Sequence, residues 1–186
     1  QGLFHDGMRR PHVMIVGSLT PSTDKSPSLL RLDEARTIFH EFGHAIHSLL
    51  ADGYYTALSG TSVLWDFVEL PSQIMENWLM EEEALNLFAR HYETGEALPK
   101  ELLDKVIAAK NFNAATANIN QLRYANLDFD WHLADPATIT DVNAFEKQAI
   151  ARYALLPMVE GTNTSCAFAH IFAGGYAAGY YSYKWA

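Results

Sequence analysis

Two histidines and a glutamate form the chain's most distinctive chemical pattern, His40-Glu41-Phe42-Gly43-His44. The two imidazoles stand four residues apart, so on a helix they lie one turn apart on one face, where both can reach one metal ion at about 2.0–2.1 Å. Glu41 lies about 100° further round the helix, beside such an ion, where its carboxylate can accept a proton from water. The spacing therefore predicts a hydrolytic zinc site with His40 and His44 as ligands and Glu41 as general base.

A third protein ligand has to come from outside this motif, because a tetrahedral catalytic zinc takes three protein ligands and keeps one position open. Glu69 and Glu76 follow downstream, together with an acidic run at 81–83 that is most simply a solvated helix face. We favour Glu69, which stands at the start of an expected helix among apolar residues, where Gln73 one turn later could support it by a hydrogen bond. Glu69 would complete the ligand set of one Zn²⁺ per chain.

Other interpretations of the motif fit the sequence less well. His47 shares the helix face of His40 but lies about 10 Å further along the axis, so one ion cannot be held by both and we assign His47 a supporting or structural role. The metzincin pattern would need glycine at the position of His47 and histidine at that of Leu50. Glu41-x-x-His44 is also half of a di-iron motif, but the chain has no second Glu-x-x-His. A non-catalytic zinc-binding helical module or pseudoenzyme is the alternative from another class, and it leaves Glu41 without a role.

The composition is that of an acidic globular domain. The 186 residues, 49% hydrophobic and 19% charged, suffice to bury a core. A net charge of −9 leaves no basic surface for a phosphate backbone, so we expect no nucleic-acid partner. No apolar run approaches the roughly 20 residues of a membrane helix, so we expect no membrane partner. The single cysteine, Cys166, cannot form an internal disulfide, which favours a reducing, cytoplasmic compartment.

The two ends of the sequence indicate a part of a longer protein. The chain begins at Gln1 without methionine and ends in an aromatic run at 180–186 that holds no helix stop signal. We expect residues 1–186 to be an excised part of one catalytic domain.

The elements that must position these residues are mostly α-helices. Apolar residues recur with helical spacing from Asp33, a candidate N-cap, to about Ala51, and this helix would carry the histidine motif. A second helix should begin near Glu69, because Pro71 is tolerated only in a first turn. A short β-strand, a long helix and a helix capped by Asp141 are expected at 13–16, 100–133 and 141–155, and a Gly-rich segment leads into a last aromatic helix.

Four segments carry a family resemblance: Phe39–His44, Asp66–Gln73, Glu76–Trp78 and His170–Tyr176. They resemble the thimet oligopeptidase family of zinc metallopeptidases. The segments around Glu69 and at 170–185 are most similar to the bacterial oligopeptidase A and peptidyl-dipeptidase branches. The resemblance extends over about 13–186 and is looser over 127–165. It implies an almost wholly helical zincin-type catalytic domain, part of a clamshell whose halves enclose a deep substrate channel.

The resemblance implies the same roles for the motif residues, with zinc on His40, His44 and Glu69 and with Glu41 as general base. It further implies hydrolysis of peptide bonds in short peptides, by release of C-terminal dipeptides or by internal cleavage. The remainder of the same polypeptide would complete the substrate channel.

Four further site residues rest on the resemblance alone. It implies that His170, Tyr176 and Tyr183 act in catalysis, by contacting the substrate or stabilising the intermediate, and that Tyr180 binds substrate. The spacing from His170 to the Gly-Gly-Tyr sequence matches the peptidyl-dipeptidase branch, whereas the thimet oligopeptidase branch has one residue fewer. Each tyrosine could instead pack in the core of an aromatic helix.

Overall fold

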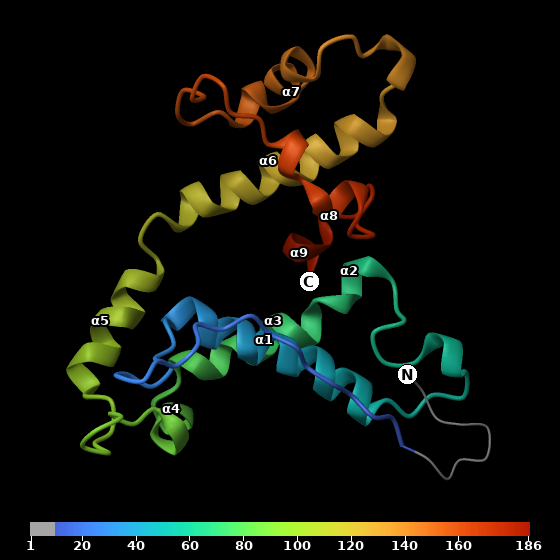
Figure 1. Cartoon of the computed structure of the whole chain (residues 1–186). Coiled ribbons are helices and arrows are strands. Elements are labelled where there is room, and N and C mark those ends of the chain that lie inside the picture. The colour runs from blue at the N-terminus through green and yellow to red at the C-terminus, as the bar shows by residue number, and fades with distance from the viewer. Residues whose placement is uncertain (1–9) are drawn as a thin grey trace. The chain divides into compact units, whose positions relative to one another are not determined.

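The computed structural model describes residues 10–186, and helices are its main regular elements (Figure 1), which confirms the predicted mostly α fold. The chain divides into two compact units, Gln1–Asn111 and Phe112–Ala186. Among the described residues, no helix combines the length and the apolar character needed to cross a membrane.

The first unit carries the histidine motif on its longest helix. In chain order its helices are α1 (Leu32–Leu50), α2 (Trp65–Val68), α3 (Leu70–Glu76), α4 (Glu82–Phe88) and α5 (Lys100–Lys110), with 3₁₀ turns at Thr56–Leu58 and Asn77–Met80. The expected helix start near Glu69 is confirmed, since Glu69 joins α2 to α3 and Pro71 lies in the first turn of α3.

Helix α1 begins slightly earlier than expected. Its N-cap is Arg31, and the side chain of Glu34 accepts a hydrogen bond from the Arg31 backbone N–H at 2.9 Å. Asp33, predicted as the N-cap, instead lies in the first turn and pairs with the Arg31 guanidinium at 3.0 Å. That position still suits a carboxylate, because the first turn carries the positive end of the helix dipole.

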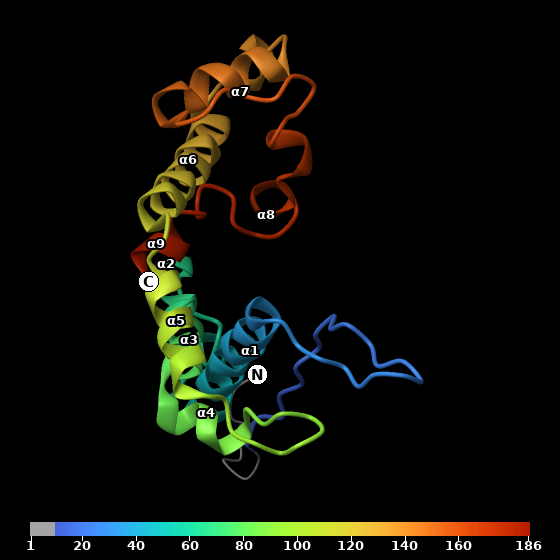
Figure 2. The ribbon, with the colours of Figure 1, turned by 90° about the vertical axis from the view of Figure 1, so that its left-hand side faces the viewer.

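The close contact of α1 with α3 organises the first unit. Figures 1 and 2 show the two helices alongside each other. A Cβ added at Gly43 would lie 2.4 Å from the backbone oxygen of Pro71 and 2.5 Å from Cα of Ser72. The glycine between the two histidines therefore lets the backbones of α1 and α3 approach directly.

A small apolar core lies beside this contact. Leu79, Leu85 and Leu103 are buried there, so the 3₁₀ turn after α3 packs with α4 and α5. Ala35 and Phe39 of α1 pack against the same cluster. The N-terminal half of α1 is thus held by the 3₁₀ turn, α4 and α5, which all follow it in the chain.

The short strand predicted at 13–16 is not formed, and the segment has no regular structure. Among residues 10–186, β pairing is limited to isolated bridges between Thr23 and Ser26 and between Arg90 and Ala97. A β-rich sequence forms a strand only where a neighbouring strand pairs its backbone groups, and local composition cannot supply that neighbour.

The long helix predicted at 100–133 is instead two helices, α5 and α6 (Ala114–Leu133). Asn113 separates them with φ of 57°, a left-handed conformation that ends the helical hydrogen-bond ladder. Asparagine adopts this region more readily than most residues. The division between the two compact units falls at the same place.

The second unit is built on α6. Its other elements are α7 (Val142–Ile150), α8 (Ala169–Phe172) and α9 (Ser182–Trp185), with 3₁₀ turns at Pro136–Thr138, Ala151–Tyr153 and Ser165–Ala167. The Asp141 cap is confirmed, because its side chain accepts hydrogen bonds from the backbone N–H groups of Asn143 and Ala144 at 2.8 and 3.2 Å. The core consists of Leu127, Ile150, Phe168 and Ile171.

Replacing Gly43 with alanine should destabilise the protein by about 1–3 kcal/mol, the usual cost of forcing extra atoms into a packed interior. The added methyl group would meet backbone atoms of α3, which cannot move aside as a flexible side chain can. Urea denaturation of the two proteins measures the difference.

Gly53→Ala is the matched control, because a Cβ at Gly53 meets no atom within 4 Å. That substitution should leave the free energy of unfolding within about 0.5 kcal/mol of its original value. Equal effects of the two substitutions would contradict the packing role of Gly43.

Candidate metal centre

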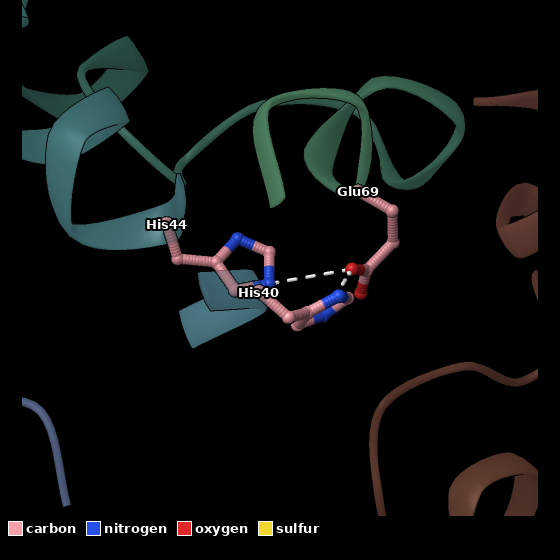
Figure 3. A group of neighbouring side chains, drawn as sticks. All are labelled: His40, His44 and Glu69. Carbon is pink, nitrogen blue, oxygen red and sulfur yellow. Dashed lines mark ion pairs between the residues drawn. The ribbon is translucent and has the colours of Figure 1, made fainter. Parts of the chain in front are cut away.

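The structure brings His40, His44 and Glu69 together from α1 and the start of α3 (Figure 3). Oε2 of Glu69 lies 3.1 Å from Nε2 of His40 and 3.3 Å from Nε2 of His44. One ligand-type atom from each residue falls within 4.8 Å of the other two. The three side chains therefore converge on one point.

Glu69 is held firmly in this arrangement. Glu69 is only 2% exposed, and its Oε2 accepts a hydrogen bond from the Ser72 hydroxyl at 2.8 Å. The same hydroxyl lies 2.8 Å from the backbone oxygen of Glu69. Because Ser72 is fully buried one turn along α3, it fixes the direction in which the carboxylate points.

The second ring nitrogen of His40 also has a defined partner. Nδ1 of His40 lies 2.8 Å from Oε1 of Glu76, and the other oxygen of Glu76 lies 3.8 Å from Nε of Arg36. Hydrogen bonds to Glu69 and then to Glu76 raise the pKa of His40 to about 9, against the effect of burial. The Glu76 contact orients the ring so that Nε2 faces Glu69.

His44 and His47 have less polar surroundings. Nδ1 of each is buried and has no hydrogen-bond partner within the described part of the chain. The ring of His47 packs edge-on against Phe67, with centroids 6.0 Å apart, and burial together with neighbouring His44 lowers its pKa. These contacts match the structural role expected for His47.

Two imidazole nitrogens and one carboxylate oxygen are a donor set that suits a catalytic zinc ion. The fit is supported by the convergence of these atoms and by the fixed orientation of His40 and Glu69. Glu41 follows His40 on α1 and is partly buried. The helix repeat places it about 100° round from His40.

The residues expected to contact substrate form a separate cluster within the second unit. The rings of Tyr176 and Tyr183 stack with centroids 5.0 Å apart, and the exposed His170 lies 6.1 and 6.4 Å from them. Tyr180 lies 5.9 Å from His170 and also packs against Phe168 at 5.0 Å. The structure thus gathers all four residues that the resemblance singled out.

Tyr180 is the most deeply packed of these rings. It contacts the core cluster, and burial, followed by the neighbouring Tyr183 and Tyr124, raises its pKa to about 12. Its hydroxyl therefore keeps its proton throughout the physiological pH range.

The turn between His170 and Tyr176 depends on glycine. A Cβ at Gly174 would lie 2.9 Å from both Cα and the backbone oxygen of His170. Gly175 has φ of 86°, a conformation that favours glycine. The backbone N–H of Tyr176 donates to the His170 carbonyl at 3.0 Å, which closes the turn and draws the two residues together.

Sequence reasoning missed the supporting roles of Ser72 and Glu76. Both follow Glu69 at helical intervals, three and seven residues on, so all three share one face of a helix that starts at Glu69. The spacing alone could therefore have indicated that Ser72 and Glu76 lie beside Glu69. Asp128 and Glu146, two fully buried carboxylates of the second unit, were also missed, because their partners lie far along the chain.

Comparison with known proteins gives a consistent family match. The model of Peptidase family M3 matches residues 1–186. The chain is 45% identical over 184 residues to oligopeptidase A of Escherichia coli, and 41% identical over 184 residues to organellar oligopeptidase A, chloroplastic/mitochondrial, of Arabidopsis thaliana. It is also 42% identical over 178 residues to dipeptidyl carboxypeptidase of Salmonella typhimurium.

These alignments cover nearly all of this chain but a small part of each relative. They span 96%, 96% and 95% of the chain and 27%, 23% and 26% of the three relatives, in the order named. The chain therefore spans about a quarter of the length of these relatives.

The contacts of His40 predict how the stability of the metal-free protein depends on pH. The two carboxylates raise the folded-state pKa of His40 to about 9 from an ordinary value of 6.5. The stabilisation is therefore complete below pH 6.5 and is lost as the pH rises through about 9. We expect the free energy of unfolding, measured in chelator at several pH values, to fall over this interval. His40→Gln should remove that part of the fall, and an unchanged pH dependence in this variant would contradict the assignment.

Proposed function

This chain belongs to peptidase family M3, and we propose that it carries the zinc site of a peptidase, with His40, His44 and Glu69 as the protein ligands. The observation that carries the proposal is the convergence of one ring nitrogen from each histidine and one carboxylate oxygen within 4.8 Å of one another. Glu76 and Ser72 support the proposal, because they orient His40 and Glu69.

A zinc ion bound there would polarise the peptide carbonyl and lower the pKa of the attacking water. Glu41 is the proposed general base. Its carboxylate would accept a proton from that water and return it to the nitrogen of the leaving amine. The alternative, a zinc-binding module without catalysis, gives Glu41 no function.

The second unit would supply groups that act on the substrate. We assign to His170, Tyr176 and Tyr183 the donation of hydrogen bonds to the oxygen on which negative charge develops. Their gathering into one cluster supports a shared role. Tyr180, whose ring contacts both the cluster and the core, would line the substrate site.

The proposed substrates are short peptides. Relatives are named oligopeptidase A and dipeptidyl carboxypeptidase, so both internal cleavage and release of C-terminal dipeptides are proposed for this chain. Incubating the full-length protein with peptides of about ten residues, free or blocked at the C-terminus, and identifying the products separates the two. Release of C-terminal dipeptides alone, and only from the peptide whose C-terminus is free, would indicate the dipeptide-releasing activity.

We further propose that residues 1–186 are part of one larger catalytic domain, whose remainder completes the substrate channel. Several apolar side chains of the first unit support this proposal, because they are exposed among the described residues. They include Phe42 and Leu49 on the apolar face of α1, at 45% and 41%, and Leu50 and Leu64, at 73% and 78%. Further polypeptide covering these side chains would remove apolar surface from water.

The names of the relatives point to different cellular compartments. One is named chloroplastic/mitochondrial and another is named probable cytosolic oligopeptidase A. The cytoplasmic location expected from the single cysteine therefore stays a prediction.

Substituting Glu69 should weaken zinc binding far more than substituting Glu76. Glu69→Ala removes a proposed ligand, whereas Glu76→Ala removes a partner of the His40 ring, a change that typically costs about 10- to 100-fold in metal affinity. Titration of the full-length variants with zinc against a competing chelator measures both constants. Glu81→Ala, in an exposed residue of the first unit, is the control and should bind as the unsubstituted protein does. Unchanged affinity in Glu69→Ala would refute the ligand assignment.

Glu41→Gln should retain zinc but lower the rate of peptide hydrolysis by about 10²- to 10⁴-fold, the usual contribution of a general base. The amide keeps the shape of the side chain and leaves both histidines in place, but it cannot accept the proton. Zinc content and kcat are measured on the same full-length preparation. Near-normal turnover at full zinc content would disprove the role of Glu41.

A further inference from the structure

Asp128 is a fully buried carboxylate on α6 that accepts two backbone hydrogen bonds and has a histidine ring beside it. Oδ1 accepts from the backbone N–H of Ala178 at 2.9 Å, and Oδ2 accepts from that of Tyr180 at 2.9 Å. Nδ1 of His132 lies 2.9 Å from Oδ1. Because a buried charge is tolerated only where donors compensate it, these contacts tie the segment at 177–180 to α6.

The segment that Asp128 holds has an unfavourable backbone conformation. Ala178 has φ of 53°, in the left-handed region that residues with a Cβ rarely adopt. Such conformations persist only where surrounding contacts impose them, and they concentrate at functional sites. The N–H group of Ala178 itself donates to Asp128, so the carboxylate supplies a contact that imposes this conformation.

The same segment determines where the proposed substrate-contacting tyrosines lie. Tyr176 precedes the anchored residues, Tyr180 is anchored through its own backbone N–H, and Tyr183 follows. The ring of Tyr183 packs against both other tyrosines, at 5.0 and 5.1 Å. A shift of the anchored backbone would therefore be transmitted to all three rings.

His132 completes the arrangement on the side of α6. Its Nδ1 lies 2.8 Å from the backbone oxygen of Asp128 as well as 2.9 Å from the carboxylate. The ring thus bridges the main chain and side chain of one residue, which restricts rotation of the carboxylate.

We propose that Asp128, oriented by His132, is a positioning residue that holds Tyr176 and Tyr183 in the geometry needed to stabilise the reacting carbonyl oxygen. This inference rests on the proposed peptidase function. Asp128 itself would touch neither substrate nor metal.

The test compares Asp128→Asn with Glu146→Gln in the full-length protein. Glu146 is a matched control, because it is also fully buried in the second unit and its carboxylate also accepts two loop backbone hydrogen bonds, from the N–H groups of Thr164 and Ser165 at 2.8 and 2.7 Å. It accepts a third from the Ser165 hydroxyl at 2.6 Å. Its loop at 163–167 carries none of the proposed substrate-contacting residues. Each amide keeps the side chain's shape but faces one former donor with an NH₂ group.

We expect Asp128→Asn to lower kcat and kcat/KM together by about 10- to 100-fold, the cost of misplacing a group by about 1 Å. Zinc content should stay unchanged. Glu146→Gln should change kcat/KM by less than about 3-fold even if it lowers the thermal midpoint equally, since a loss of stability alone leaves the folded enzyme's kcat intact. Equal effects of both substitutions on kcat would overturn the proposal.

A double-mutant cycle isolates the route through the tyrosines. If Asp128 acts through them, adding Asp128→Asn to Tyr176→Phe/Tyr183→Phe should cost less than about 3-fold in kcat/KM, because the groups it positions are already gone. Full additivity would overturn the proposal. If Asp128→Asn fails to fold, His132→Ala takes its place in the test. It should also lower kcat and kcat/KM, and an unchanged kcat would count against the inference.

Amide hydrogen exchange provides a readout independent of activity. Asp128→Asn should speed exchange at Ala178 and Tyr180, and Glu146→Gln should speed it at Thr164 and Ser165 instead. Absence of peptide hydrolysis by the unsubstituted enzyme would refute the peptidase function, whereas retained hydrolysis in Glu41→Gln would refute only the role of Glu41. Unchanged exchange at 177–180 in Asp128→Asn would refute the positioning role by itself.

Discussion

The distance between the backbones of α1 and α3 controls the whole candidate metal centre. Gly43 has no side chain, so the backbone atoms of Pro71 and Ser72 can lie directly against α1. Glu69 stands at the start of α3, and this approach brings its carboxylate within 3.1 and 3.3 Å of the two imidazoles. The glycine inside the histidine motif therefore serves the packing of the two helices, while its neighbours serve the proposed chemistry.

In each unit, buried carboxylates fix the positions of neighbouring groups. Glu69 is 2% exposed and faces two imidazoles and a hydroxyl, whereas Asp128 and Glu146, at 0%, accept hydrogen bonds from loop backbones. An uncompensated buried charge costs several kcal/mol, so a conformation that breaks these contacts is strongly disfavoured. Such groups can hold loops more rigidly than apolar contacts do, because a hydrogen bond has a preferred direction.

The departures from the sequence-based expectations share a physical origin. One helix was expected across Asn111–Asn113, but α5 ends at Lys110 and Asn113, in a left-handed conformation, precedes α6. The β-rich run at 13–16 remains irregular because no strand pairs with it among the described residues. Both predictions were wrong, because they rested on local composition, whereas strand pairing and helix packing depend on partners elsewhere in the chain.

The sequence by itself determined the features that depend on helical spacing: the shared face of His40 and His44, the start of α3 near Pro71 and the Asp141 cap. These follow from residues within about one turn of each other, whose relative positions the helix repeat sets. Only the tertiary structure decided that Glu69 meets the imidazoles while Glu76 supports His40, and that Asp128 anchors the segment at 177–180. These contacts join residues 29, 36 and up to 52 positions apart. No sequence periodicity links such residues, because their distance is set by how closely the intervening elements pack.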